Sequence, residues 1–107
     1  MTDVKVSVTF RHTQPTHALK RYAEEKAHKI GKYFSSPLEA HMVLSVDSKN
    51  RQLAEVTLQT RRLTIHGREE TADLYSAIDL VMDKIERQVR KYKTKYQTKS
   101  RRRKIKG

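Results

Sequence analysis

The last third of the chain limits the possible folds most, because it carries an apolar stripe at helical spacing. Residues three or four positions apart share one face of an α-helix. The stripe consists of Leu74, Ile78, Val81, Met82, Ile85, Val89, Tyr92 and Tyr96. A helix with such a stripe must bury it against other parts of the chain. The sequence therefore predicts a long amphipathic helix that packs on a sheet or on a second helix.

A basic stripe lies beside the apolar one and continues to the end of the chain. It consists of Lys84, Arg87, Lys91 and Lys95, followed by Lys99, Arg101, Arg102, Arg103, Lys104 and Lys106. Residues 87–107 hold 11 Lys and Arg and no acid, whereas residues 1–86 hold 13 Lys and Arg against 12 acids. A local excess of positive charge attracts polyanions. Nucleic acid is the expected partner, and an anionic membrane is the weaker alternative because the apolar face has no Trp.

Length and composition exclude several classes of protein. A chain of 107 residues is long enough for one domain with a modest core. The absence of cysteine excludes disulfides and thiolate metal sites. No apolar run approaches the roughly 20 residues of a membrane span, and the N-terminus has no signal-peptide layout. We therefore expect a cytoplasmic protein with no membrane partner.

Residues that carry chemistry are not arranged in any catalytic or metal-binding pattern. The histidines at 12, 17, 28, 41 and 66 lack the spacing of metal ligands. No nucleophile elbow, P-loop or paired catalytic carboxylate motif is present. The sequence indicates a non-enzyme with no cofactor, no metal and no small-molecule substrate.

Four segments alternate between apolar and polar residues, which is typical of half-buried strands. They cover residues 3–10, 38–46, 54–60 and 63–68. Between the first two, a helix is expected to start at Thr13 or Thr16 and to end by Pro37. Its buried face consists of Leu19, Tyr22, Ala23, Ile30, Tyr33 and Phe34. Lys26 lies within this face, so its amine should reach outward to solvent. Thr71 is expected to cap the second helix.

The resulting order is β-α-β-β-β-α, which predicts an α+β fold. Two amphipathic helices and one apolar sheet face fit best as two helices packed on one face of a four-stranded sheet, the arrangement of double-stranded-RNA-binding domains. A right-handed first crossover would make the first two strands parallel if they are neighbours. Every periodic apolar residue lies at or before Tyr96, so we expect a domain over 1–96 and a flexible basic tail over 97–107.

The element order and three segments together resemble the ribosome hibernation-promoting factor family. The segments are EEKAHKIGKYF at 24–34, AEVTLQT at 54–60 and ADLYSAIDLVMDKIERQVRKYKTK at 72–95. The resemblance implies binding to the small ribosomal subunit and its rRNA, at the channel that mRNA and tRNA would occupy, with translation silenced in starvation or stationary phase. Family members are short forms, or long forms with a C-terminal dimerisation domain. This chain is expected to be either a monomeric short form with an unusual basic tail or the N-terminal domain of a longer protein.

The basic residues of both helices are the predicted RNA-binding site. They are Arg21, Lys29, Lys32, Lys84, Arg87, Arg90, Lys91, Lys95, Arg101, Arg102 and Arg103. We expect them to form one continuous basic edge that binds phosphates without reading base sequence. Asp79, Asp83 and Glu86 are expected to pair with Arg87 and Arg90 at i,i+4.

Two other functions compete with ribosome silencing. A general double-stranded-RNA-binding module would share the layer arrangement and would bind isolated duplexes tightly. An enzyme that acts on RNA is the third reading, and no group of residues supports it. Lys5, Ser7 and Thr9 lie on the other face of the predicted sheet and receive no role.

Overall fold

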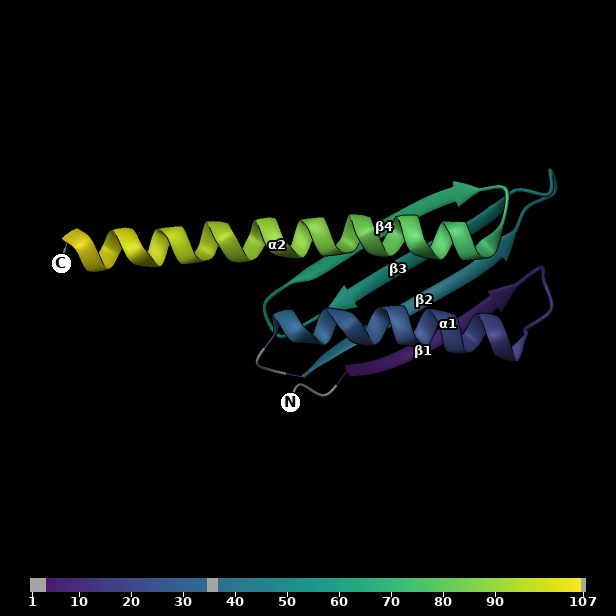
Figure 1. The fold of residues 1–107 in the computed structure, drawn as a ribbon, viewed down its shortest axis with the longest axis horizontal. Helices are drawn as coiled ribbons and strands as arrows, with labels where there is room; N and C mark the ends of the chain where they lie inside the picture. The colour runs from purple at the N-terminus through teal and green to yellow at the C-terminus, as the bar shows by residue number, and fades with distance from the viewer. Residues whose placement is uncertain (1–3, 35–36, 107) are drawn as a thin grey trace.

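The computed structural model describes residues 4–34 and 37–106, with side chains up to residue 93. Its elements are β1 (Val4–Arg11), α1 (His17–His28), the short 3-10 helix η1 (Lys29–Tyr33), β2 (Leu38–Val46), β3 (Gln52–Gln59), β4 (Thr64–Thr71) and α2 (Leu74–Lys106). The predicted order β-α-β-β-β-α is confirmed (Figure 1).

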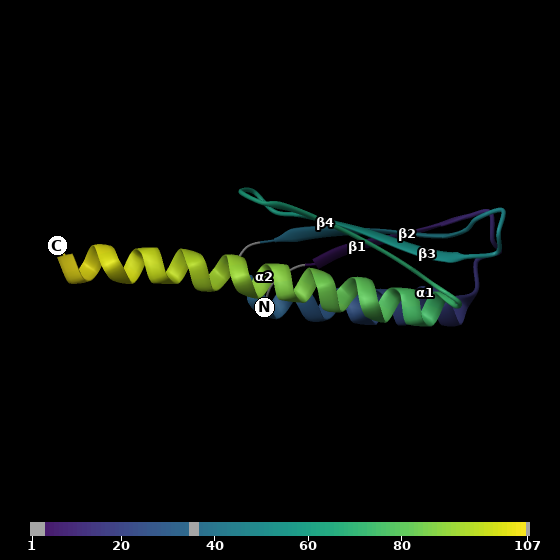
Figure 2. The ribbon, with the colours of Figure 1, turned by 90° about the horizontal axis from the view of Figure 1, so that it is seen from above.

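The strands form one four-stranded sheet in the order β1-β2-β3-β4. β1 pairs with β2 in parallel, as expected for a crossover through α1, and the other two pairs are antiparallel. Figure 2 shows both helices on one face of the sheet, which confirms the predicted two-layer α+β architecture. The opposite face carries no helix, and we call it the open face.

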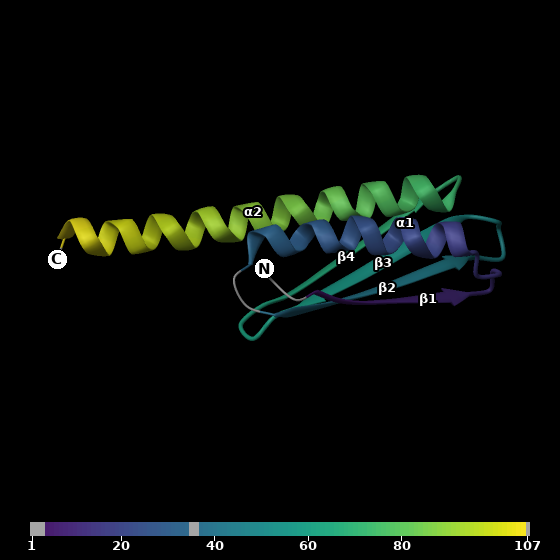
Figure 3. The same ribbon diagram turned by 60° about the horizontal axis from the view of Figure 1, so that its bottom comes forward.

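The helices run side by side in the same direction, and α2 is much the longer (Figure 3). Its C-terminal part extends past the ends of α1 and of the sheet, so the molecule measures 57 Å along its longest axis and 26 Å along the next. Among the described residues, no helix is long and apolar enough to cross a membrane.

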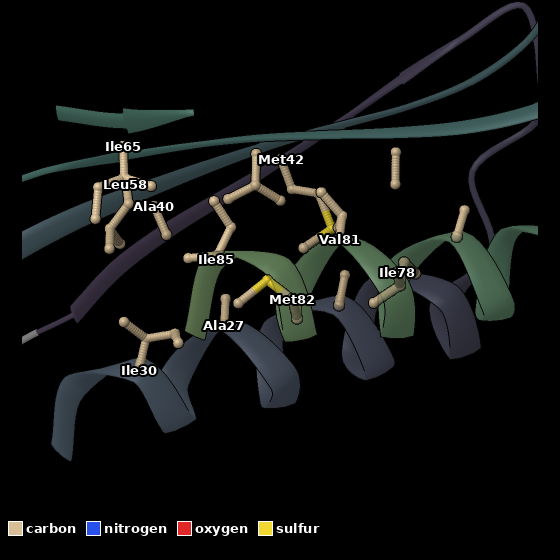
Figure 4. Close-up of a cluster of buried hydrophobic side chains, with 14 of the residues drawn as sticks. Ala27, Ile30, Ala40, Met42, Leu58, Ile65, Ile78, Val81, Met82 and Ile85 are labelled. Carbon is tan, nitrogen blue, oxygen red and sulfur yellow. The ribbon is translucent and has the colours of Figure 1, made fainter. Parts of the chain in front are cut away.

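The core lies between the sheet and the helices (Figure 4). Ile78, Val81 and Ile85 of α2 are completely buried, as the stripe predicted. At Gly67 of β4 an added Cβ would lie 3.0 Å from Cδ1 of Ile85. Glycine at this position therefore lets α2 approach the sheet closely. Each large aliphatic side chain buried here contributes about 1.5–3 kcal/mol to the free energy of unfolding.

The helix starts agree with the sequence in one case and differ in the other. Thr16 caps α1, because its hydroxyl oxygen accepts a hydrogen bond from the Leu19 N–H at 3.2 Å. The expectation that Thr71 caps α2 is wrong. Thr71 is the last residue of β4, which runs three residues beyond the predicted strand.

Asp73 takes the capping position of α2. Its Oδ1 accepts from the Ser76 N–H at 2.9 Å, and its Oδ2 accepts from the Ser76 hydroxyl at 2.8 Å. These hydrogen bonds, the backbone one first, hold the pKa of the Asp73 carboxyl below its ordinary value. An ionised carboxylate at a helix N-terminus also interacts favourably with the helix dipole.

Candidate nucleic-acid interface

Exposed basic residues gather on the outer surface of the helix layer. Arg21 and Lys29 lie on the solvent side of α1 and η1, and Arg87 and Lys91 lie on that of α2. In α2 this follows from helical spacing: Ile85 and Val89 point into the core, and residues about half a turn away point outward. Arginine and lysine in such positions can bind phosphate oxygens, arginine in a bidentate manner.

The seam between the two helices carries carboxylates. Asp79 of α2 accepts a hydrogen bond from the Tyr22 hydroxyl at 2.5 Å and forms an ion pair with the Lys26 amine at 3.5 Å. Glu86, two turns further on, accepts from the Tyr33 hydroxyl at 3.0 Å. The expected single basic edge is therefore two basic groups, one on each helix, with a seam of engaged carboxylates between them.

The seam also changes the protonation behaviour of its residues. The pKa of the Tyr22 phenol is raised, chiefly because its hydroxyl donates to the Asp79 carboxylate. The pKa of the Lys26 amine is raised, chiefly by the negative charge of Asp79. Lys26 does reach out of the buried face of α1, as predicted, and there it binds an acid of the neighbouring helix.

Two predicted site residues of α2 are engaged by carboxylates of the same molecule. The Lys84 amine lies 3.5 Å from Glu69 of β4. Arg90 lies 3.8 Å from Glu86, which confirms one of the expected i,i+4 pairs. Within the described part of the chain, Asp83 and Arg87 do not pair, and Arg21, Lys29, Arg87 and Lys91 have no acidic partner. Among the predicted site residues whose side chains are described, these four are the most available to an external anion, since Lys32 lies over the Tyr33 ring.

Lysines and aromatic rings meet where η1 ends beside α2. The Lys32 amine lies 5.2 Å from the centre of the Tyr33 ring, and the Lys93 amine lies 5.0 Å from the centre of the Phe34 ring. Lys93 is not among the predicted site residues. Its position four residues after Val89 places it on the α1 side of α2, but the sequence gives no sign that Phe34 is its neighbour.

The remaining predicted residues, Lys95 and Arg101–Arg103, lie in the part of α2 whose side chains are not described. The backbone there is helical as far as Lys106. Their role in RNA binding, and the division into a domain over 1–96 and a flexible tail over 97–107, stay predictions.

The described residues include no group of three or more His, Asp or Glu that could hold a metal ion. Instead, the helix layer presents exposed Lys and Arg side chains on the surface of two packed helices. Contacts of this kind bind the sugar-phosphate backbone and position a protein without reading bases.

Comparisons with known sequences identify relatives along nearly the whole chain. Residues 6–97 match the family described as Sigma 54 modulation protein / S30EA ribosomal protein. The ribosome hibernation promotion factor of Lactococcus lactis subsp. cremoris (strain MG1363) is 37% identical over 100 residues, which is 92% of this chain and 54% of that protein. The factor of the same name from Staphylococcus aureus (strain COL) is 41% identical over 88 residues, 80% of this chain and 46% of that protein.

Solved structures with the same fold carry related names. The N-terminal domain of Thermus thermophilus Protein Y has a TM-score of 0.75 and 31% identity, with 84% of this chain and 98% of that chain covered. A ribosomal subunit interface protein from Coxiella burnetii has a TM-score of 0.73 and 26% identity, with coverage of 88% and 99%. This chain spans about half the length of the curated relatives it matches. By sequence and fold together, it belongs to the family of the ribosome hibernation promotion factors.

Proposed function

We propose that this chain is the ribosome-binding domain of a hibernation factor and silences translation by occupying the mRNA–tRNA channel of the small ribosomal subunit. The proposal includes a cytoplasmic setting and action during starvation or stationary phase. It requires no catalysis, because a protein that fills the channel excludes mRNA and tRNA by its volume alone.

The observation that carries the proposal is the set of unpaired cations on the helix layer. Arg21, Lys29, Arg87 and Lys91 are exposed, have no acidic partner among the described residues and lie on two rigid helices. The helices fix the backbone of these residues, so only their side-chain rotamers must be ordered when they bind phosphates. The named relatives supply the ribosome as the source of those phosphates.

The two basic groups suit a cleft better than a flat surface. Along the line between the helices, Asp79 is paired with Lys26 and Glu86 with Arg90, so this line offers phosphates no unpaired cation. Phosphates would therefore bind on either side of this line, at α1 and at α2. An rRNA-lined channel presents two walls in this way, and each wall could meet one group.

A competition experiment tests occlusion of the channel. Small subunits are preloaded with mRNA and initiator tRNA, and labelled protein is then added at fixed salt. We expect binding of the protein to fall as the channel is filled, and initiator tRNA to be excluded when the protein is added first. Simultaneous binding of all three at unchanged affinity would contradict the proposal and would move the site to the exterior of the ribosome.

A comparison of affinities for small subunits and for an isolated RNA duplex separates this function from that of a general double-stranded-RNA binder. The specific observation that favours the alternative is the layer arrangement, two helices on one face of a sheet. A general binder would bind an isolated RNA duplex as tightly as the small subunit. A hibernation factor should prefer the subunit, because only the channel engages both helices at once.

A further inference from the structure

The open face of the sheet carries a row of four polar side chains that crosses all the strands. The register places Ser7 of β1 beside His41 of β2, His41 beside Thr57 of β3, and Thr57 beside His66 of β4. Ser7, His41 and His66 are exposed, and Thr57 is half-buried. Both helices lie on the other face, so this row faces solvent (Figure 2).

The hydrogen bonds of the row hold both imidazoles in place. Nδ1 of His41 lies 2.5 Å from the Ser7 hydroxyl, and Nδ1 of His66 lies 3.1 Å from the Thr57 hydroxyl. A hydroxyl can donate to a neutral imidazole and accept from a protonated one. Each pair therefore survives protonation, and each ring gains a positive charge without losing its partner.

Cations flank the row on the same face. Lys5 and Arg68 lie in the neighbouring rows, and Arg11 lies at the end of β1; all three are exposed and have no acidic partner among the described residues. A shallow hollow in the sheet surface is lined by Lys5, Ser7, Glu39 and His41. An anion that enters this hollow would meet the Lys5 amine and the His41 ring together.

Carboxylates set the balance of charge on the open face. Glu70 is engaged by Arg51 at 2.5 Å, and Glu55 lies 3.9 Å from Nε2 of His66. Glu39 is exposed beside Lys5 in the register. The open face thus has four cations and three carboxylates, namely Lys5, Arg11, Arg51 and Arg68 with Glu39, Glu55 and Glu70. Its net charge is +1 when His41 and His66 are neutral and +3 when both are protonated. Protonated His66 also neutralises Glu55, which would otherwise repel phosphate.

We infer that the open face is a second RNA-contact surface, which binds the sugar-phosphate backbone through the His41–His66 row and tightens as pH falls. RNA fits better than a protein or a lipid surface. Among the described residues, the exposed large apolar side chains are Tyr75 and Leu80, and both lie on α2. The open face thus lacks the apolar centre that a stable protein interface needs. Among its described residues the open face also has no Phe, Tyr or Trp on which a base could stack.

The inference rests on the proposed function. It adds a second RNA-contact surface, the open face, and a measurable property, an RNA affinity that depends on pH. Histidine is the side chain whose ordinary change of charge falls between about pH 8 and pH 5. RNA affinity that depends on the open face should therefore change across this range. Affinity that depends only on Lys and Arg of the helix layer should not.

The test measures binding of the full chain to a labelled RNA hairpin and, in parallel, to small ribosomal subunits at about pH 8 and about pH 6 with salt held constant. We expect wild-type affinity for the hairpin to rise about tenfold at the lower pH. His41→Gln/His66→Gln should reduce this rise to less than about twofold, because glutamine keeps a polar group but does not titrate. The single variants His41→Gln and His66→Gln should each remove part of it.

The control is His17→Gln/His28→Gln, which removes two exposed histidines of α1. It should keep the full rise. If the sheet variants retain the pH dependence, or if the α1 pair carries it instead, or if no tightening is seen at all, the inference is wrong. If the hairpin shows the histidine-dependent rise while small subunits do not bind, the proposed function fails and the open face remains an RNA-contact surface.

Discussion

The two halves of α2 belong to one continuous helix but differ in what they contact. The first half lies over the sheet and buries Ile78, Val81, Ile85 and Val89 completely. The second half continues past the sheet and past α1 as far as Lys106 (Figure 1). Its sequence from residue 94 onward holds seven Lys and Arg and no acid. The first half therefore maintains the fold, whereas the second half carries positive charge beyond the edge of the sheet.

The first half itself has a core side and a solvent side. Substitutions on the core side should change stability without changing the affinity of the folded protein for RNA, and substitutions of exposed cations should do the reverse. The predictions below test this separation, from the largest expected effect to the smallest.

Ile85→Ala should lower the free energy of unfolding by about 3–4 kcal/mol, because it removes buried methylene groups and leaves a cavity between α2 and Gly67 of β4. Urea unfolding monitored by circular dichroism measures the loss. The control is Leu80→Ala on the same helix, where the side chain is 45% exposed; its effect should stay within about 0.5 kcal/mol. Equal losses for both variants would show that α2 is not packed as described.

Arg87→Glu/Lys91→Glu should weaken binding to small subunits about a hundredfold, close to 3 kcal/mol, and lower the free energy of unfolding by less than about 1 kcal/mol, since both positions are exposed and the new carboxylates are only i,i+4 neighbours of each other and of Asp83. Lys84 is omitted because it already pairs with Glu69, so reversing it would bring two carboxylates together. Sedimentation with subunits over a salt series measures the affinity. The log–log salt slope should fall by about 0.9 for each lost phosphate contact.

For a control matched in charge, the single variant Lys49→Glu is compared with the single variant Arg87→Glu. Lys49 is an exposed lysine in the β2–β3 turn, away from the helix layer. Lys49→Glu should leave subunit affinity nearly unchanged. If it weakens binding as much as Arg87→Glu does, the attraction depends on total charge and not on the helix layer.

Periodicity was enough to predict the sheet and the core but not the neighbours of each helix. Alternation identifies the buried side of a strand, and a spacing of three to four identifies the buried stripe of α2. Neither tells which element lies beside a helix. The sequence predicts a partner for Asp79 within its own helix, which is wrong, and predicts none for Glu69. The packing of α2 between β4 and α1 pairs Asp79 with Lys26 and Glu69 with Lys84.

Element ends were harder to predict because they depend on competing local hydrogen bonds. The strand signal of β4 weakens after Gly67, where Arg68, Glu69 and Glu70 follow, yet pairing with β3 continues to Thr71. The helix start moved to Asp73 as a result. The last turns of the first helix also differ: the regular α-helix ends at His28, and the 3-10 helix η1, which contains Gly31, follows.

Tyr22→Phe should lower the free energy of unfolding by about 1 kcal/mol, because it removes the hydroxyl that donates to Asp79 in the helix–helix seam. Tyr75→Phe is the matched control. Tyr75 packs edge-on against Tyr22 with ring centres 5.1 Å apart, but no hydrogen bond of its hydroxyl is found among the described residues. Thermal melts of both variants give the comparison. Both variants keep the aromatic ring, so an equal or larger loss for Tyr75→Phe would show that the hydrogen bond from Tyr22 to Asp79 does not stabilise the seam.

Asp73→Asn should change the acid dependence of stability more than stability itself. Because the pKa of Asp73 is lowered in the folded state, the carboxylate stabilises the fold above its unfolded pKa of about 3.9. This contribution is lost as pH falls through the folded pKa. Asparagine caps at any pH. The melting temperature of wild type should therefore fall relative to the variant below about pH 4, and parallel curves would exclude Asp73 as the titrating cap.

Truncation after residue 97 should have the smallest effect on stability, since it tests whether the projecting half of α2 supports the domain at all. The removed segment, 98–107, carries six Lys and Arg and no acid. Its like charges repel one another, and a chain with a net charge of +12 is destabilised by self-repulsion. Loss of the segment should leave the free energy of unfolding within about 0.5 kcal/mol or raise it slightly.

A second truncation after residue 88 is the control, because it removes Val89, which is completely buried, and the contact of Lys93 with the Phe34 ring. That truncation should cost several kcal/mol. If the two truncated proteins melt at the same temperature, the part of α2 that maintains the fold does not end at the edge of the sheet.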